Sequence, residues 1–167
     1  KSVTGYDIPK LLTGSLGTLG VIVEATLRLH PVQPAIGSWL FSFTSREAAA
    51  ALVAAVLASS LEPERLAWLN AGALERVGSE RAEAALAVSV ATVAEAVASQ
   101  GAEVNSMASR LGARVSALEE GFWTRVGGAL ASSTVVKLAS EIRRLPFWAA
   151  EVERVMSRHG LTVSLVG

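Results

Sequence analysis

The chain has 167 residues and a formal net charge of zero, because 15 basic residues balance 15 acidic ones. A balanced charge gives no global field that would favour nucleic acid, so the composition argues against nucleic-acid binding. Apolar residues make up 51% of the chain, yet no uninterrupted apolar run reaches the ~20 residues that span a bilayer. The absence of cysteine excludes disulfides and thiolate metal ligands and fits a reducing cytoplasm.

The segment 1–22 carries the most informative pattern. Residues 4–7 predict a turn, and Pro9 favours a short helix over 7–13 that stops at Gly14. Glycines at 14, 17 and 20 then lead into a β-branched strand, and glycine lets bare backbone approach a bulky anionic group. Because these glycines precede a strand, a Rossmann fingerprint is excluded. Spacing alone is more typical of an ordinary glycine-rich turn.

This opening segment resembles the flavoprotein oxidases and dehydrogenases of the vanillyl-alcohol-oxidase type, which have a PCMH-type FAD-binding domain. Within that family it is most similar to the FAD-binding E subunits of bacterial glycolate oxidases. Ser2 departs from the family pattern, which has asparagine there. The likeness rests on Lys1, Val3, Thr4, Gly5, Tyr6, Asp7, Leu11, Leu12, the run from Gly14 to Ile22, Glu24 and Thr26.

The resemblance implies FAD as the cofactor, held in part by the backbone of the glycine loop. Backbone N–H groups suit this role because they bind anionic oxygens without adding a mobile charge. The resemblance also implies that Tyr6 and Asp7 lie near the substrate or flavin. Asp7 can also cap the following helix, which is the more frequent role, and the phenol of Tyr6 can equally be a buried structural hydroxyl. The implied cofactor-binding residues are Gly14, Ser15, Gly17, Thr18, Gly20, Val21 and Ile22.

The resemblance further implies oxidation of a small-molecule 2-hydroxy acid such as glycolate, with the cofactor carrying the redox step. It implies association with other oxidase subunits, a second flavoprotein and an iron–sulfur subunit, which could bring a cytoplasmic protein to the inner face of the membrane. The chain begins inside a motif, so we interpret it as a C-terminal fragment that is inactive and does not bind FAD tightly alone. The alternative is a non-catalytic structural subunit of a flavoprotein complex.

The sequence predicts a domain boundary where prolines end the first strand. Apolar residues alternate over 21–29, which favours a β-strand. Pro31 and Pro34 then interrupt the pattern, because proline cannot donate to a sheet. We expect residues 1–33 to end an FAD-binding domain and residues 34–167 to form the substrate-side cap, truncated at its C-terminus.

The cap pattern predicts an α+β, ferredoxin-like fold with a mainly antiparallel sheet and helices on one face. Thr44 and Glu47 form a predicted capping box for the first cap helix. The segment 84–90 could be helix or strand, and its alternation favours a strand. The predicted strands cover 36–43, 65–70, 84–90, 134–139 and 161–167, and the predicted helices cover 45–59, 71–77, 92–111, 116–125 and 145–160.

The sequence gives little support for a metal site, a hydrolase site or a Walker-type nucleotide site. His30 and His159 have no partner histidine at metal-ligand spacing, so we predict no metal site. No hydrolase signature or Walker-type loop is present. Lys137 could face a carboxylate substrate, although an outward-facing lysine on a sheet explains it equally well. The catalytic residue is unknown from sequence.

Overall fold

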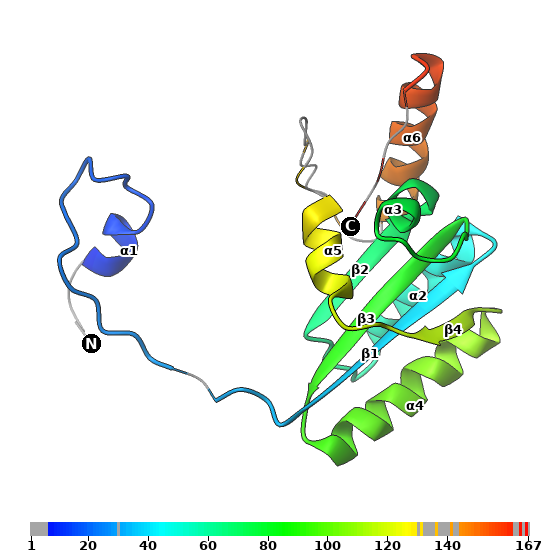
Figure 1. The fold of residues 1–167 in the computed structure, drawn as a ribbon, viewed down its shortest axis with the longest axis horizontal. Coiled ribbons are helices and arrows are strands. Elements are labelled where there is room, and N and C mark those ends of the chain that lie inside the picture. The colour runs from blue at the N-terminus through cyan, green and yellow to red at the C-terminus, as the bar shows by residue number, and fades with distance from the viewer. Residues whose placement is uncertain are drawn as a thin grey trace. The chain divides into compact units, whose positions relative to one another are not determined.

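The computed structural model describes residues 7–29, 31–129, 131, 136, 141, 144–161, 164 and 166. The chain divides into two compact units, Lys1–Val32 and Gln33–Gly167. Figure 1 shows the elements of each unit along the chain. The division falls beside the predicted proline boundary, while the assignment of the units to an FAD domain and a cap stays a prediction.

The first unit contains one short helix followed by a loop. Helix α1 covers Ile8–Leu12, with Pro9 in its first turn as predicted. The predicted strand over 21–29 is wrong, because these residues form neither strand nor helix. A strand requires a neighbour that accepts and donates its backbone hydrogen bonds, and none of the described residues pairs with this segment.

The second unit is built on a four-stranded antiparallel sheet. Its strands are β1 (Ala35–Phe43), β2 (Arg65–Asn70), β3 (Ala84–Thr92) and β4 (Arg114–Ala117). They lie in the order β2-β3-β1-β4, which with crossover helices after β1 and β3 is a ferredoxin-like arrangement. The ambiguous segment 84–90 is therefore a strand, confirming the prediction.

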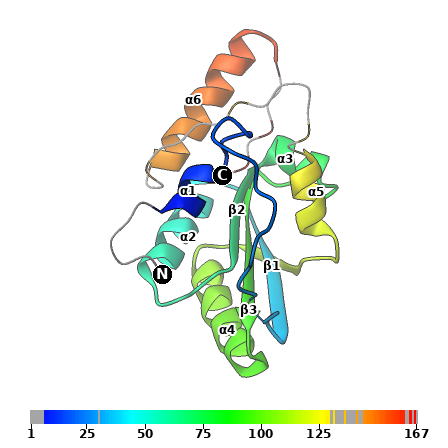
Figure 2. The same cartoon turned by 90° about the vertical axis from the view of Figure 1, so that its left-hand side faces the viewer.

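The two crossover helices, α2 (Arg46–Ala58) and α4 (Ala94–Arg110), cover one face of the sheet. Figure 2 shows them on one side of the strands. Alternate strand residues such as Phe41, Trp68 and Leu86 are buried beneath them with Leu52 of α2. This period-two alternation is why the sequence pattern predicted β3 correctly.

The opposite face is covered by α3 (Ala71–Arg76) and α5 (Phe122–Ala129). Their buried residues pack on Leu40, Leu69 and Ala87 from the other side of the same strands. The prediction of helices on one face therefore holds only for the crossover helices. Both faces are apolar, because β1, β2 and β3 each have a continuous buried stretch rather than one solvated side.

Two local predictions need correction. Ser116 and Ala117, predicted as helical, lie in β4 and pair with Leu40 and Trp39, because sheet pairing overrides local propensity. The helix that follows begins only at Phe122, after Gly121 with φ of +80°.

The cap of α2 also differs from the prediction, since Ser45 and not Thr44 is the N-cap residue. Its hydroxyl accepts a hydrogen bond from the Ala48 N–H at 3.1 Å and donates to the Glu47 carboxylate at 3.0 Å. The predicted strand at 134–139 falls almost entirely outside the described residues. Of the predicted strand 161–167 only residues 161, 164 and 166 are described. Within it, Val166 forms an isolated antiparallel bridge with Leu69.

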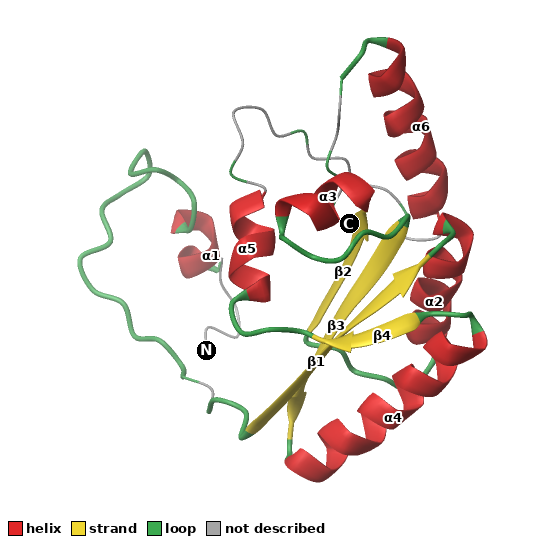
Figure 3. Ribbon diagram, turned by 45° about the vertical axis from the view of Figure 1, so that its right-hand side comes forward, coloured by secondary structure: helices red, strands yellow, loops and turns green. Residues whose placement is uncertain are grey.

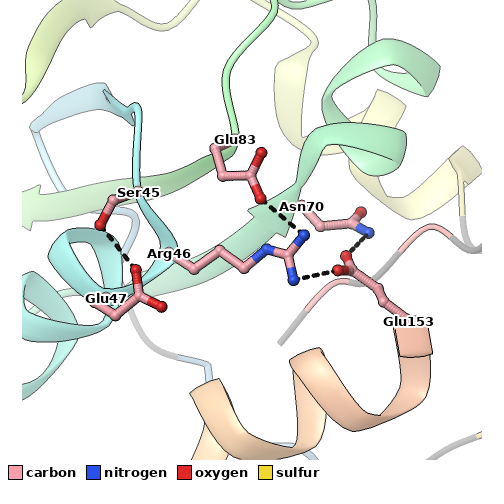
Figure 4. A network of polar contacts seen from close by, with 6 residues as sticks. All are labelled: Ser45, Arg46, Glu47, Asn70, Glu83 and Glu153. Atoms are coloured by element: carbon pink, nitrogen blue, oxygen red, sulfur yellow. Dashed lines mark hydrogen bonds and ion pairs between the residues drawn. The ribbon is translucent and has the colours of Figure 1, made fainter. Parts of the chain in front are cut away.

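Helix α6 (Leu145–Arg158) extends beyond the sheet and is tied to it by a polar network (Figures 3 and 4). Arg46 forms ion pairs with Glu83 at 2.7 Å and with Glu153 of α6 at 2.5 Å. The side-chain amide of the buried Asn70 donates to Glu153 at 2.7 Å. The side-chain oxygen of Asn70 accepts from the Ala73 N–H at 2.9 Å and so caps α3. The network joins α2, α3 and α6 and is structural in character.

Candidate functional site

The glycine loop after α1 is held by short local hydrogen bonds. The Ser15 N–H donates to the carbonyl of Leu12 at 3.2 Å, and the Thr18 N–H donates to the carbonyl of Ser15 at 3.0 Å. The Thr18 hydroxyl donates to the same Ser15 carbonyl at 2.7 Å. These bonds fold residues 12–18 into consecutive turns that present backbone outward.

Two of the glycines are required by the backbone itself. Gly14 and Gly17 both have φ of +80°, a conformation that L side chains rarely adopt. A Cβ atom at either position would meet nothing within 4 Å, so the loop is open on that side. Leu16 between them also has a positive φ of 51° and is 95% exposed. The loop therefore stores backbone strain in a segment without a core of its own.

The end of the loop presents unpaired backbone donors. The amides of Leu19, Gly20, Val21 and Ile22 make no hydrogen bond within the described residues. Unpaired amides in an open glycine-containing segment fit a group with anionic or carbonyl oxygens, such as the diphosphate or the ring of a flavin nucleotide. The seven residues that the resemblance implies for FAD thus lie within one exposed segment, 14–22. Their role stays a prediction.

Asp7 and Tyr6 have different outcomes. The Asp7 carboxylate accepts a hydrogen bond from the Lys10 N–H at 3.2 Å and is the N-cap of α1. The capping alternative for Asp7 is therefore the one that the structure shows. Tyr6 lies outside the described residues, as do His30 and Lys137.

The first unit exposes far more apolar surface than a stable isolated unit would. None of its described residues is buried, and large apolar side chains exposed together in one segment indicate an interaction site. The exposed large apolar residues of this unit are Ile8, Leu11, Leu16, Leu19, Val21, Ile22, Val23, Leu27, Leu29 and Val32. The glycine loop therefore lies in a segment that requires a partner surface.

The second unit contains a hollow of about 570 Å³ between α2 and the start of α6. Its wall consists of apolar residues of α2 together with Leu145 and Pro146. No charged side chain of the described residues lines it, so this part of the chain offers no group there that would orient a polar substrate.

The described residues contain neither a candidate metal site nor a helix that could span a membrane. Within the described ranges, no group of three or more His, Cys, Asp or Glu side chains could hold a metal ion. None of the helices in the described part of the chain is long and apolar enough to cross a membrane.

Comparison with known proteins finds relatives for part of the chain. No family model matches it. Glycolate oxidase subunit GlcD of Bacillus subtilis (strain 168) is 36% identical over 70 residues, covering 42% of this chain and 15% of the relative. D-2-hydroxyglutarate dehydrogenase of Xanthomonas citri pv. viticola is 38% identical over 87 residues, covering 52% of this chain and 18% of the relative. A probable mitochondrial D-lactate dehydrogenase of Danio rerio is 36% identical over 70 residues, covering 42% of this chain and 14% of the relative.

A solved structure of alkyldihydroxyacetonephosphate synthase shares the fold, with a TM-score of 0.70 at 16% identity. The match covers 93% of this chain and 37% of that structure. The matched segments are thus a small part of each full-length relative. The resemblance to FAD-linked oxidoreductases and the α+β fold predicted from the pattern of elements are confirmed. The closer likeness to the E subunit stays a prediction, since the glycolate oxidase relative named above is a D subunit.

Proposed function

We propose that this chain is part of an FAD-dependent oxidoreductase that oxidises a small 2-hydroxy acid. The observation that carries the proposal is the sequence identity of 36 to 38% to relatives named for glycolate, D-lactate and D-2-hydroxyglutarate. All three compounds carry a hydroxyl on the carbon beside a carboxylate. Because the relatives differ in the rest of the molecule, the proposal names this class and not one substrate.

The glycine loop is the proposed flavin contact. The unpaired amides of residues 19–22 and the open side of Gly14 and Gly17 fit close approach of a nucleotide cofactor. Ser15 and Thr18 stabilise the loop, since the Ser15 carbonyl accepts both the amide and the hydroxyl of Thr18. A bound FAD would supply the redox chemistry, namely acceptance of a hydride from the hydroxyl-bearing carbon.

The exposed apolar face of the first unit supports the same proposal. Ten large apolar side chains in a unit without a core require a covering surface. We infer that this surface is the remainder of an FAD-binding domain. The second unit, with its own core, would form the cap that shapes the substrate pocket. In a full oxidase the cap would also meet the proposed partner subunits, a second flavoprotein and an iron–sulfur subunit.

The experiment that tests the proposal uses the full-length gene product, purified and examined for flavin. We expect visible flavin absorbance that bleaches on anaerobic addition of glycolate, D-lactate or D-2-hydroxyglutarate. A colourless protein that cannot be reconstituted with FAD would instead support the alternative, a non-catalytic subunit of a flavoprotein complex.

A matched pair of variants tests the loop itself. Gly17 and Gly112 have similar positive φ values of +80° and +75°, and an added Cβ meets nothing within 4 Å at either. Gly17→Ala and Gly112→Ala therefore introduce similar backbone strain. We expect only Gly17→Ala to lower the flavin content of the full-length protein. Equal flavin content in the two variants would contradict the loop's proposed role.

A further inference from the structure

Three polar residues lie in a row across neighbouring strands of the cap sheet. Arg65 of β2 is the register partner of Ser89 in β3, and Ser89 is the register partner of Ser38 in β1. Directly paired residues of antiparallel strands point to the same face, with Cβ atoms about 5 Å apart. The Ser38 hydroxyl donates to the Ser89 hydroxyl at 3.0 Å. The row lies on the face that α3 and α5 cover, since its neighbours Ala67, Ala87 and Leu40 belong to that core.

The end of the row at Arg65 carries hydrogen-bond donors without acceptors. The Arg65 guanidinium lies over the Trp123 ring of α5, 5.7 Å from its centroid. Arg65 forms no ion pair with any described residue. The Trp123 indole nitrogen is shielded from solvent and has no hydrogen-bond partner among the described residues. A shielded N–H without an acceptor costs free energy, so the site is short of one acceptor.

Two other arginines near this face have partners among the described residues. Arg125, two residues after Trp123 on α5, donates to the Val77 carbonyl at 3.0 Å and contacts Glu119 at 3.4 Å. Arg114 of β4 forms an ion pair with Glu80 at 3.0 Å. Arg65 alone of these three retains a free planar fork of donors, which matches the two oxygens of a carboxylate.

We propose that Arg65 and Trp123 form a carboxylate-binding site, with the Ser38–Ser89 pair as its polar neighbour on the sheet. The guanidinium supplies the positive charge and the paired donors that hold the carboxylate, and the shielded indole of Trp123 beneath it reports the binding. This inference deepens the proposed function and rests on it for its purpose, which is to hold the carboxylate of a 2-hydroxy acid. The binding itself requires no flavin and can be measured separately.

The test follows the indole N–H signals of the 167-residue chain in ¹H–¹⁵N NMR spectra. The chain has four tryptophans, and Trp123→Phe assigns the relevant signal. We expect the Trp123 signal to move saturably with acetate and with D-lactate, with a dissociation constant of about 1 mM, and not with chloride at equal ionic strength. Trp68, whose unpaired indole lies on the opposite face of the sheet, is an internal control that stays unchanged.

Two arginine variants make the test specific. Arg65→Gln is expected to abolish the shift, whereas Arg81→Gln, which removes another exposed arginine without an ion pair, leaves it intact. Arg65→Lys keeps the charge without the planar fork and is expected to weaken binding about tenfold. Unchanged signals of Trp39 and Trp68 show that each variant is folded.

The proposal is overturned if carboxylates leave the Trp123 signal unmoved, if Arg65→Gln retains the shift, or if inorganic phosphate moves the signal as strongly. Such results would mean that Arg65 only packs on the Trp123 ring and binds no carboxylate. They would not affect the flavin proposal, which is measured by absorbance of the full-length protein. Conversely, a colourless full-length protein would leave carboxylate binding by Arg65 and Trp123 intact.

Discussion

The two units of the chain use similar local devices with very different results. Each has a helix with a side-chain N-cap, Asp7 for α1 and Ser45 for α2. In the second unit α2 buries four residues against the sheet, whereas α1 buries none. Capping and proline placement therefore determine where a helix begins, while burial determines whether it is stable. The first unit has the local signals of a fold and lacks its core.

This difference separates stability from the proposed function. Residues of the second unit contribute to its core, and their substitution should affect unfolding. Residues of the glycine loop contribute little to that core, and their substitution should affect ligand binding in the full-length protein. The comparison predicts that the same substitution has different consequences in the two units.

The largest difference is expected for a matched pair of leucine truncations. Leu52 of α2 is fully buried, whereas Leu16 of the glycine loop is 95% exposed. Leu52→Ala removes buried methyl groups and leaves a cavity, so we expect a loss of about 2–5 kcal/mol in the free energy of unfolding. Leu16→Ala should change it by less than about 0.5 kcal/mol. Urea unfolding monitored by tryptophan fluorescence measures both, and equal losses would show that the first unit shares the core.

Glycine substitutions give a smaller difference of the same kind. Gly101 of α4 lies against Trp39, and an added Cβ would come within 2.5 Å of the indole ring. Gly101→Ala should cost about 1–3 kcal/mol through overpacking, although alanine is the better helix former. At Gly14 an added Cβ meets nothing within 4 Å, so Gly14→Ala should leave the unfolding of the second unit unchanged. A stabilised Gly101→Ala protein would mean that Trp39 moves aside without cost.

The sequence predicted the second unit well because its elements carry redundant signals. The strand β3 was ambiguous in composition, and the alternation of Leu86, Val88 and Val90 identified it correctly. The strand β4 was missed because its four residues, Arg114 to Ala117, are all exposed and show no burial pattern. Only pairing with β1 makes them a strand, and pairing between distant segments cannot be read from local sequence.

The candidate sites differ in the same way. The glycine loop could be predicted because its residues are contiguous and glycine restricts the backbone in a recognisable pattern. The Arg65 and Trp123 site could not, because its residues come from β2 and α5, far apart along the chain. The register of β1, β2 and β3 is what brings Ser38, Ser89 and Arg65 into one row.

The smallest expected effect concerns the pH dependence of the α2 cap. Hydrogen bonds from its own backbone N–H and then from the Ser45 hydroxyl lower the pKa of Glu47. Since the pKa is lower in the folded state, the ionised carboxylate stabilises the fold at neutral pH. That contribution is lost as the pH falls below about 4.3 and through the lowered pKa. The stability difference between the unmodified chain and Glu47→Gln should therefore shrink on acidification.

Ser45→Ala provides the control for this pH effect, because it removes one of the two hydrogen bonds that lower the pKa of Glu47. In the Ser45→Ala protein, the change in unfolding free energy caused by Glu47→Gln should vary less with pH. Ser45→Ala itself should lower the free energy of unfolding by about 1 kcal/mol, because the N-cap is lost. Urea midpoints measured from neutral pH down to the acid limit of folding give both quantities. A Glu47→Gln difference that grows on acidification would reverse the sign of the linkage, and the α2 cap would then stabilise the protonated carboxyl. The comparison between the N-cap of α2, which is packed on a core, and the N-cap of α1 at Asp7 would then no longer include a stabilising carboxylate at α2.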